Sequence, residues 1–248
     1  MEEFYFYTKR LTVGYHGVPL IKDIELCLKK GEIMTLIGPN GAGKTTILKS
    51  IIRQLKPLGG VACLDGSSME KLTGKELSQK LSVVLTERVR PEMMTCKDVV
   101  ATGRYPYTGK FGILSEKDWA IVQESMELVH IEELAERDIT QVSGGQLQRA
   151  CICRSMINAP KILFADEPTG ALNMSAAGEV MDEFERLNSA GTTILMVTHD
   201  SRVAARCGRI LYLLDGKIRG ELELSDQKKQ TDMERMKCVE AWLGKMGW

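Results

Sequence analysis

The sequence has no excess of charge of either sign and no long apolar run. Lys plus Arg and Asp plus Glu both number 33 among 248 residues, so no overall field attracts nucleic acid or acidic lipid. No uncharged apolar stretch approaches the ~20 residues that cross a bilayer. Residues 1–4 are acidic at their start and lack the basic and apolar segments of a secretory signal. We therefore expect a cytoplasmic protein without a nucleic-acid partner, whose contact with any membrane is peripheral.

The cysteine pattern excludes a disulfide framework. The seven cysteines are an odd number and lie in apolar segments, as Cys27, Cys63 and Cys207 do. Such a distribution is typical of reduced, buried thiols. Cys151 and Cys153 are too closely spaced for a usual zinc pair and lie in a helical pattern, so core packing is expected for both.

The most informative motif in the sequence is a glycine-rich segment at 38–46. An apolar run at 33–37 precedes it and a helical pattern at 47–52 follows, which is the strand–turn–helix context of a phosphate-binding loop. Its glycines let backbone N–H groups converge on one anion at a helix N-terminus. Lys44 is expected to reach the β- and γ-phosphates of a nucleoside triphosphate, and the Thr45 hydroxyl to bind Mg²⁺. The candidate nucleotide-binding residues here are Gly38, Asn40, Gly41, Ala42, Gly43, Lys44, Thr45 and Thr46.

Polar residues follow two further segments whose apolar runs predict buried strands. Asp166 and Glu167 come at the end of the apolar run 162–165, and His199 follows the run 192–198. The carboxyl ends of parallel strands meet at one edge of a sheet, so these side chains should face the phosphate loop. Asp166 suits the shell of Mg²⁺. Glu167 suits positioning of an attacking water, and His199 suits contact with the γ-phosphate.

A second anion site is expected at Ser143, Gly144, Gly145 and Gln146. Ser143 is a good N-cap, and the helix that follows begins with N–H groups at the positive end of a dipole. Because the chain already has a complete phosphate loop, the economical explanation is that this second site acts on nucleotide held by a partner. A plain helix cap is the alternative.

Strand and helix periodicities predict an α/β fold. It comprises a P-loop NTPase core, with a mixed sheet flanked by helices, an N-terminal antiparallel β-subdomain and an inserted helical subdomain. We expect one domain over 1–248: the core with its β-subdomain over 1–85 and 156–224, and the helical subdomain over 86–155. A helical tail is expected over 225–248. This tail has apolar residues at helical spacing, so it is expected to pack on the domain or to bind a partner.

The motifs resemble those of a known family. The segment 38–45, Ser143 to Gln146, the segment 162–167 and His199 look like the Walker A, signature, Walker B and switch-histidine motifs of ABC-transporter ATPase subunits. The resemblance covers about residues 4–222. It implies an ATPase with ATP and Mg²⁺ bound, working as a homodimer that sandwiches two ATP molecules between the Walker A loop of one subunit and the signature of the other. It also implies that Tyr15 stacks on adenine.

Within this family the sequence carries two conflicting likenesses. The segment 104–109 is similar to importers of iron–siderophore, haem or vitamin B12 type, and it lies where such proteins dock on a membrane permease. The segment 168–173 resembles peptide- and lipoprotein-releasing exporters instead. We expect import of a metal chelate through a separate permease, with an extracytoplasmic binding protein acting indirectly. The ATPase would then sit on the inner face of the membrane. An exporter subunit is the alternative, and a non-transport ABC ATPase or a non-hydrolysing ATP-binding module are less favoured ones.

Two positions depart from the family pattern. Family members usually carry Gln after the strand that ends near Leu85, where this chain has Glu87, or Thr86 if the register shifts by one residue. Glu87 can still ligate Mg²⁺ or its water, but it adds negative charge beside a triphosphate. Asn173 stands where the family usually has Asp. Neither change removes Lys44, Asp166 or Glu167, so turnover is still expected.

Overall fold

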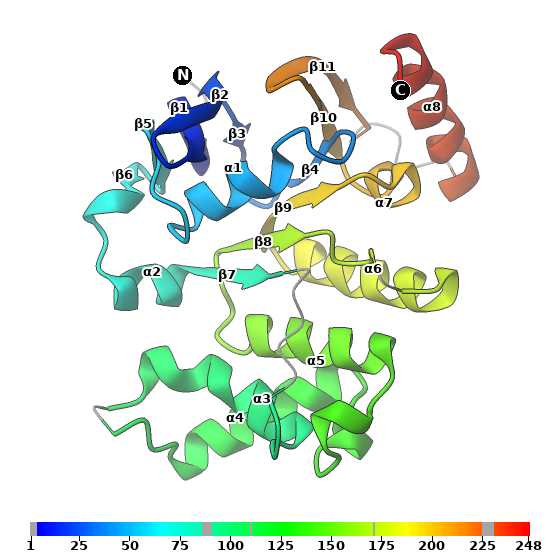
Figure 1. Ribbon diagram of the computed structural model, residues 1–248. Helices are drawn as coiled ribbons and strands as arrows, with labels where there is room; N and C mark the ends of the chain where they lie inside the picture. Colours follow the sequence, from blue (N-terminus) through cyan, green and yellow to red (C-terminus); the bar gives the residue numbers. More distant parts are fainter. Residues whose placement is uncertain (1–3, 86–90, 110, 171, 225–230) are drawn as a thin grey trace.

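The computed structural model describes residues 4–85, 91–109, 111–170, 172–224 and 231–248, and its elements form two sheets with helices around and below them (Figure 1). The first sheet is antiparallel, in the order β2-β1-β5-β6 with β3 also paired to β1. Its strands are β1 (Phe6–Tyr15), β2 (Val18–Ile24), β3 (Cys27–Leu28), β5 (Gly59–Leu64) and β6 (Ser67–Ser68). The expected N-terminal antiparallel sheet is thus present. The long strand β1 is central to this sheet, and its pairing with β2 shifts register between Leu11 and Val13.

The second sheet carries the predicted strand ends. It has the order β11-β10-β4-β9-β8-β7, and all its pairings are parallel except that of β11 with β10. The strands are β4 (Ile33–Ile37), β7 (Leu81–Val84), β8 (Ile162–Asp166), β9 (Thr193–Thr198), β10 (Arg209–Leu214) and β11 (Lys217–Glu223). Every residue of β4, β8 and β9 is buried. Continuous apolar runs of this kind are typical of parallel strands covered on both faces.

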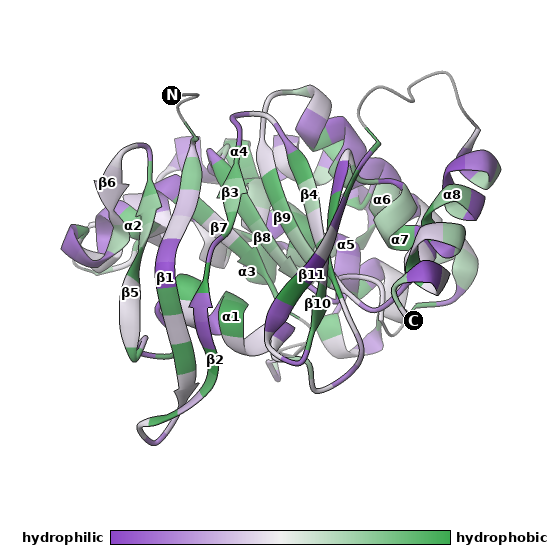
Figure 2. Ribbon diagram, turned by 90° about the horizontal axis from the view of Figure 1, so that it is seen from above, coloured by the Kyte–Doolittle hydropathy of each residue, from purple (hydrophilic) through white to green (hydrophobic). Residues whose placement is uncertain are grey.

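Side chains of β8 and β9 alternate between two cores, because successive residues of a strand point to opposite faces. Phe164 and Leu195 join a core with β1 and α1 (Lys44–Ile51), whereas Leu163 and Ile194 join a core with α6 (Met174–Ser189). Helix α7 (Ser201–Ala205) also contributes to this second core, through Val203. Viewed from above, hydrophobic residues concentrate on the central strands of the mixed sheet (Figure 2). Strand β4, which leads into the phosphate loop, is likewise buried along its whole length. The loop therefore begins from a strand that is fixed by packing.

Helices α3 (Cys96–Ala101), α4 (Glu116–Leu128) and α5 (Gly144–Met156) pack around a core of their own below the sheets (Figure 1). Each begins with a capping box, at Thr95, Ser115 and Ser143 respectively. In this motif a hydroxyl and an acidic or amide side chain satisfy two orphan N–H groups. The remaining short elements are α2 (Gly74–Lys80), η1 (Met69–Lys71), η2 (Thr102–Tyr107), η3 (Glu132–Leu134) and η4 (Ile139–Gln141).

The C-terminal tail contains helix α8 (Asp232–Lys245), which packs against β10 and α7 through Val239 and Leu243. Within the described residues, the segment 232–245 of the expected tail is helical and packs on the domain. Met233, which shares the apolar spacing, is instead 64% exposed. Among the described residues, no helix combines the length and the apolarity needed to span a membrane.

We predict that Phe164→Ala lowers the free energy of unfolding by about 3–5 kcal/mol, measured by urea denaturation. Phe164 is fully buried, and its ring meets that of Phe6 edge-on at 5.4 Å, which links the two sheets. The matched control is Phe111→Ala at a side chain that is 90% exposed, where a change within about 0.5 kcal/mol is expected. Equal losses in the two variants would contradict this account of the core.

Candidate functional site

Three strand ends meet at one edge of the mixed sheet. Strand β9 lies between β4 and β8, with Ile37 opposite Thr198 and Val197 opposite Asp166. The phosphate loop follows β4, Glu167 follows β8 and His199 follows β9. The strand order brings together the groups that the sequence predicted at this edge.

The phosphate loop depends on glycine at two places where other chain segments come close. A Cβ on Gly43 would lie 2.4 Å from Ile21 Cδ1, and Gly43 also has a φ of 94°. A Cβ on Gly38 would lie 2.3 Å from the carbonyl oxygen of Leu213 on β10. Gly43 is the N-cap of α1 and offers no side-chain acceptor to it. The N-cap therefore supplies no side-chain acceptor to the first N–H groups of α1, an arrangement that suits an anion at this helix end.

Lys44 is buried inside the loop, with 5% of its surface exposed. Its ammonium donates to the carbonyls of Gly38 at 2.7 Å and Pro39 at 3.0 Å, and lies 4.0 Å from Glu167 Oε1. Burial lowers the pKa of Lys44, while the carboxylates of Glu167 and Asp166 act in the opposite direction. A buried ammonium group donates strong, charge-assisted hydrogen bonds to phosphate oxygens.

Thr45 and Asp166 form an oxygen pair beside this lysine. The Thr45 hydroxyl donates to Asp166 Oδ1 at 2.9 Å. A hydroxyl and a carboxylate oxygen are hard donors, and Mg²⁺ prefers few protein oxygens together with phosphate oxygens and waters. The two residues therefore fit a magnesium ion. Glu87, the other residue expected to contact Mg²⁺, lies outside the described residues.

Glu167 is held in place by the end of β9. Its Oε1 lies 2.9 Å from His199 Nδ1, and its Oε2 accepts a hydrogen bond from the Thr198 hydroxyl at 3.1 Å. The backbone of Glu167 has a φ of 45°, a conformation that costs a non-glycine residue energy and persists where surrounding contacts enforce it. Thr198 was missed by the sequence reasoning. Its only signal was a hydroxyl on the last residue of a buried strand.

Tyr15 lies at the mouth of the loop. It ends β1, is 47% exposed, and its hydroxyl lies 3.2 Å from that of Thr46 on α1. An exposed ring beside the loop is placed where a nucleobase can stack on it. Val18 and Leu20 of β2 are also exposed, at 68% and 51%.

The signature segment forms a different opening. Ser143 caps α5 by accepting from the Gln146 N–H, and the Gln146 side chain accepts from the Ser143 N–H. The cavity at this helix end is also lined by Gly144, Gly145 and Asn173, and none of the phosphate-loop residues lines it. A Cβ on Gly145 would lie 3.1 Å from Ala176 Cβ on α6. The close packing of α5 against α6 therefore favours glycine at position 145, independently of any phosphate that approaches this helix end.

Comparison with known proteins decides the family. A profile of the ABC transporter family matches residues 21–170. The chain belongs to the ABC transporter family. It is 37% identical over 236 residues to the petrobactin import ATP-binding protein FpuD of Bacillus anthracis, covering 93% of this chain and 86% of that one. It is 35% identical to the iron(3+)-hydroxamate import ATP-binding protein FhuC of Bacillus subtilis, covering 84% and 77%.

Two further likenesses bear on this family member. The bacitracin export ATP-binding protein BceA of Halalkalibacterium halodurans is 33% identical, covering 91% of this chain and 89% of that one. The dimeric post-hydrolysis structure of the cassette MJ0796 bound to ADP and Pi matches with a TM-score of 0.77 and 30% identity, covering 88% and 98%. The predicted P-loop ATPase fold and the assignment as an ABC-transporter ATPase are confirmed.

We predict that Gly43→Ala weakens ATP affinity by at least about tenfold, or 1.4 kcal/mol, because the added methyl group meets Ile21 and the backbone there has positive φ. Titration with a fluorescent ATP analogue measures this loss. Gly74→Ala is the control, since a Cβ there meets nothing within 4 Å. A Gly43→Ala variant with the parent affinity would show that the loop tolerates this change in shape.

Proposed function

We propose that this chain hydrolyses ATP at the β4–β9–β8 edge to power import of an iron chelate through a separate membrane permease. The observation that carries the proposal is the convergence of Lys44, Asp166, Glu167 and His199 at one sheet edge in a member of this family. Its likeness to FpuD and FhuC supports import of an iron chelate. The location that follows is the inner face of the membrane.

Each residue has a distinct role in this proposal. The loop N–H groups and Lys44 bind the β- and γ-phosphates, and Tyr15 stacks on the adenine. Thr45 and Asp166 hold Mg²⁺, which when bound neutralises charge on the phosphates. Glu167 accepts a hydrogen bond from the attacking water and orients it. His199, fixed by Glu167 at 2.9 Å, contacts the γ-phosphate.

A second copy of the chain completes the proposed site. The cavity at Ser143 lacks the phosphate loop, so its helix end and its glycines meet nucleotide only when a partner subunit presents it. The dimeric structure of MJ0796 bound to ADP and Pi supports the pairing of two subunits.

The permease surface is proposed on the helical part, over 86–155. Tyr105, Phe111 and Ile113 are exposed by 56%, 90% and 77%, and exposed aromatic and apolar side chains are typical of interface centres. Arg104 fixes this segment by donating to Asp118 at 2.9 Å and to Asn158 at 2.7 Å. Hydrogen bonds from Ser115 and Arg104 lower the pKa of Asp118 to about 2.

An exporter ATPase is the second candidate. The likeness to BceA and the segment 168–173 favour it. The two candidates share the ATPase site and differ in the permease that the helical surface binds, so identification of a co-purifying permease separates them.

We predict that Glu167→Gln reduces ATP turnover by about 10²-fold or more while ATP binding persists. The amide no longer accepts a proton from water but keeps the size of the side chain. Phosphate release measures the turnover, and light scattering on the ATP-loaded variant should show a dimer. Glu124→Gln, at an exposed position on α4, serves as the control. Turnover at the parent rate would remove Glu167 from the proposed role.

We also predict that Phe111→Ser abolishes co-purification with the permease from detergent-solubilised membranes while leaving the ATPase rate of the free subunit unchanged. The control is Met233→Ser, which removes another exposed apolar side chain, 64% exposed and located on α8. Retention of the permease by Phe111→Ser and Tyr105→Ser together would place the interface elsewhere.

A further inference from the structure

The helix that follows His199 is too short to be stable without contacts to neighbouring elements. Helix α7 spans Ser201–Ala205, with Asp200 as its N-cap. Isolated helices shorter than about 12 residues are marginal in water, so the place of α7 is set by its neighbours. His199 directly precedes the N-cap, and any displacement of α7 is therefore passed to His199.

The C-terminal end of α7 is held from two sides. Arg206, its C-cap, donates to Asp182 and Glu185 on α6 at 2.6 Å each. From the opposite side, Arg235 of α8 donates through Nε to the Ala205 carbonyl at 2.7 Å and through Nη2 to the Cys207 carbonyl at 2.8 Å. The last carbonyls of a helix lack partners within it, and a cation at this end also meets the negative pole of the dipole.

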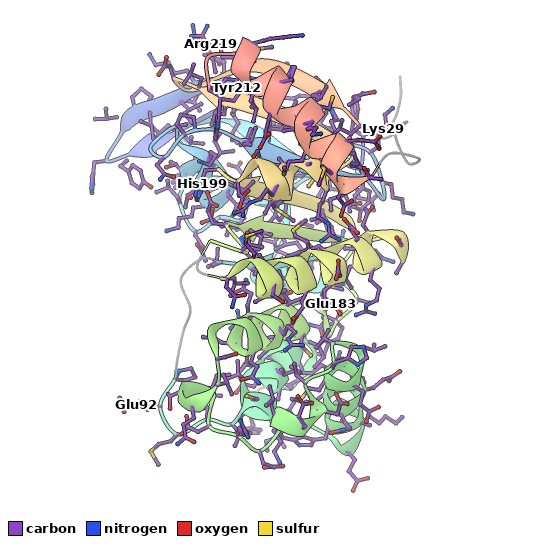
Figure 3. The ribbon with its side chains drawn as sticks, turned by 90° about the vertical axis from the view of Figure 1, so that its right-hand side faces the viewer. Lys29, Glu92, Glu183, His199, Tyr212 and Arg219 are labelled. Carbon is purple, nitrogen blue, oxygen red and sulfur yellow. The ribbon has the colours of Figure 1, made fainter. Side chains whose placement is uncertain are left out.

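Helix α8 is held on the domain by aromatic packing as well as by the hydrogen bonds of Arg235. Tyr212 of β10 meets the rings of Trp242 and Trp248 edge-on at 6.4 and 5.8 Å. A Cβ on Gly220 of β11 would lie 3.0 Å from Trp242, so this glycine makes room for the ring. Figure 3 shows Tyr212 beside α8, with His199 farther down, toward the end of β9. The β10–β11 hairpin thus holds α8, and α8 in turn holds the end of α7.

We propose that Arg235 is a positioning residue for ATP hydrolysis, acting through α7 on His199. The inference rests on the role of His199 in the proposed function. It assigns to the C-terminal helix a part in the catalytic geometry of a site that none of its residues touches. Arg235 donates to the carbonyls of Ala205 and Cys207 and not to the phosphate loop. Ile37, at the end of β4, lies in the same core as α7 and α8 but stays covered by that core when only the arginine is changed, so nucleotide affinity should change much less than kcat.

The expected result for Arg235→Ala is a fall in kcat of about tenfold with the KM for ATP and the nucleotide affinity within about twofold of the parent. Arg235→Lys should recover part of kcat, because a lysine donates to one carbonyl but lacks the fork that reaches both. Lys237→Ala, at an exposed position on the same helix, is the control and should match the parent.

Gly220→Val provides a second route that leaves Arg235 intact. The larger side chain competes with Trp242 for space, so it should displace α8 and produce the same fall in kcat without a change in affinity. Parent-like kcat in Arg235→Ala would overturn the proposal, whatever the result for Gly220→Val. A parallel loss of kcat and nucleotide affinity, accompanied by a lower melting temperature, would overturn it too, since that pattern indicates general destabilisation.

The two proposals are separated in a His199→Ala background. There, Arg235→Ala should add no further loss to the residual turnover, because the group it positions is gone. If the two substitutions reduced kcat independently, so that their fold-losses multiplied in the double variant, the proposal that Arg235 acts through His199 would be overturned. Full activity of His199→Ala alone would instead overturn the role proposed for His199. A loss in His199→Ala with parent activity in Arg235→Ala would overturn only the inference on Arg235.

Discussion

The register of β4, β9 and β8 is the constraint on which the site depends. These strands are buried on both faces and paired in parallel, so their carboxyl ends reach one edge together. A slip of one residue would exchange the faces of Asp166 and Glu167. It would also move Thr198 away from Glu167, and the two contacts that orient this carboxylate would be lost. The buried core that fixes the strand register therefore also fixes the positions of Asp166, Glu167 and Thr198.

The charges at this edge explain why a cation should accompany the triphosphate. Lys44 brings one positive charge, and Asp166 and Glu167 bring two negative ones close to it. The N-terminus of α1 adds roughly half a positive charge, which does not balance the carboxylates. A polyanion entering this site therefore requires further positive charge, and the Thr45–Asp166 oxygen pair lies where a divalent ion can supply it.

The sequence predicted those features that depend on local pattern. The strand at 33–37, the strand at 162–165 and the Ser143 cap follow from apolar runs and capping residues, and the structure contains all three. What it did not predict depends on contacts between distant segments. The positive φ of Glu167 is enforced by neighbours on β9, and Arg235 reaches a carbonyl 30 residues away. No local pattern encodes such contacts, because each partner is chosen by the packing of whole elements.

The two anion sites of one chain are incomplete for opposite reasons. The Lys44 site has cation, loop and carboxylates, but His199 beside it is 48% exposed, whereas the Ser143 cavity has a helix end and no phosphate loop. Hydrolysis needs a closed site, since water exclusion strengthens every charge interaction at the γ-phosphate. In the proposed dimer, a second subunit supplies closure and the missing donors in one step. This complementarity favours turnover by the dimer, and on the proposed role of His199 its alignment within each subunit is a condition for activity of the pair.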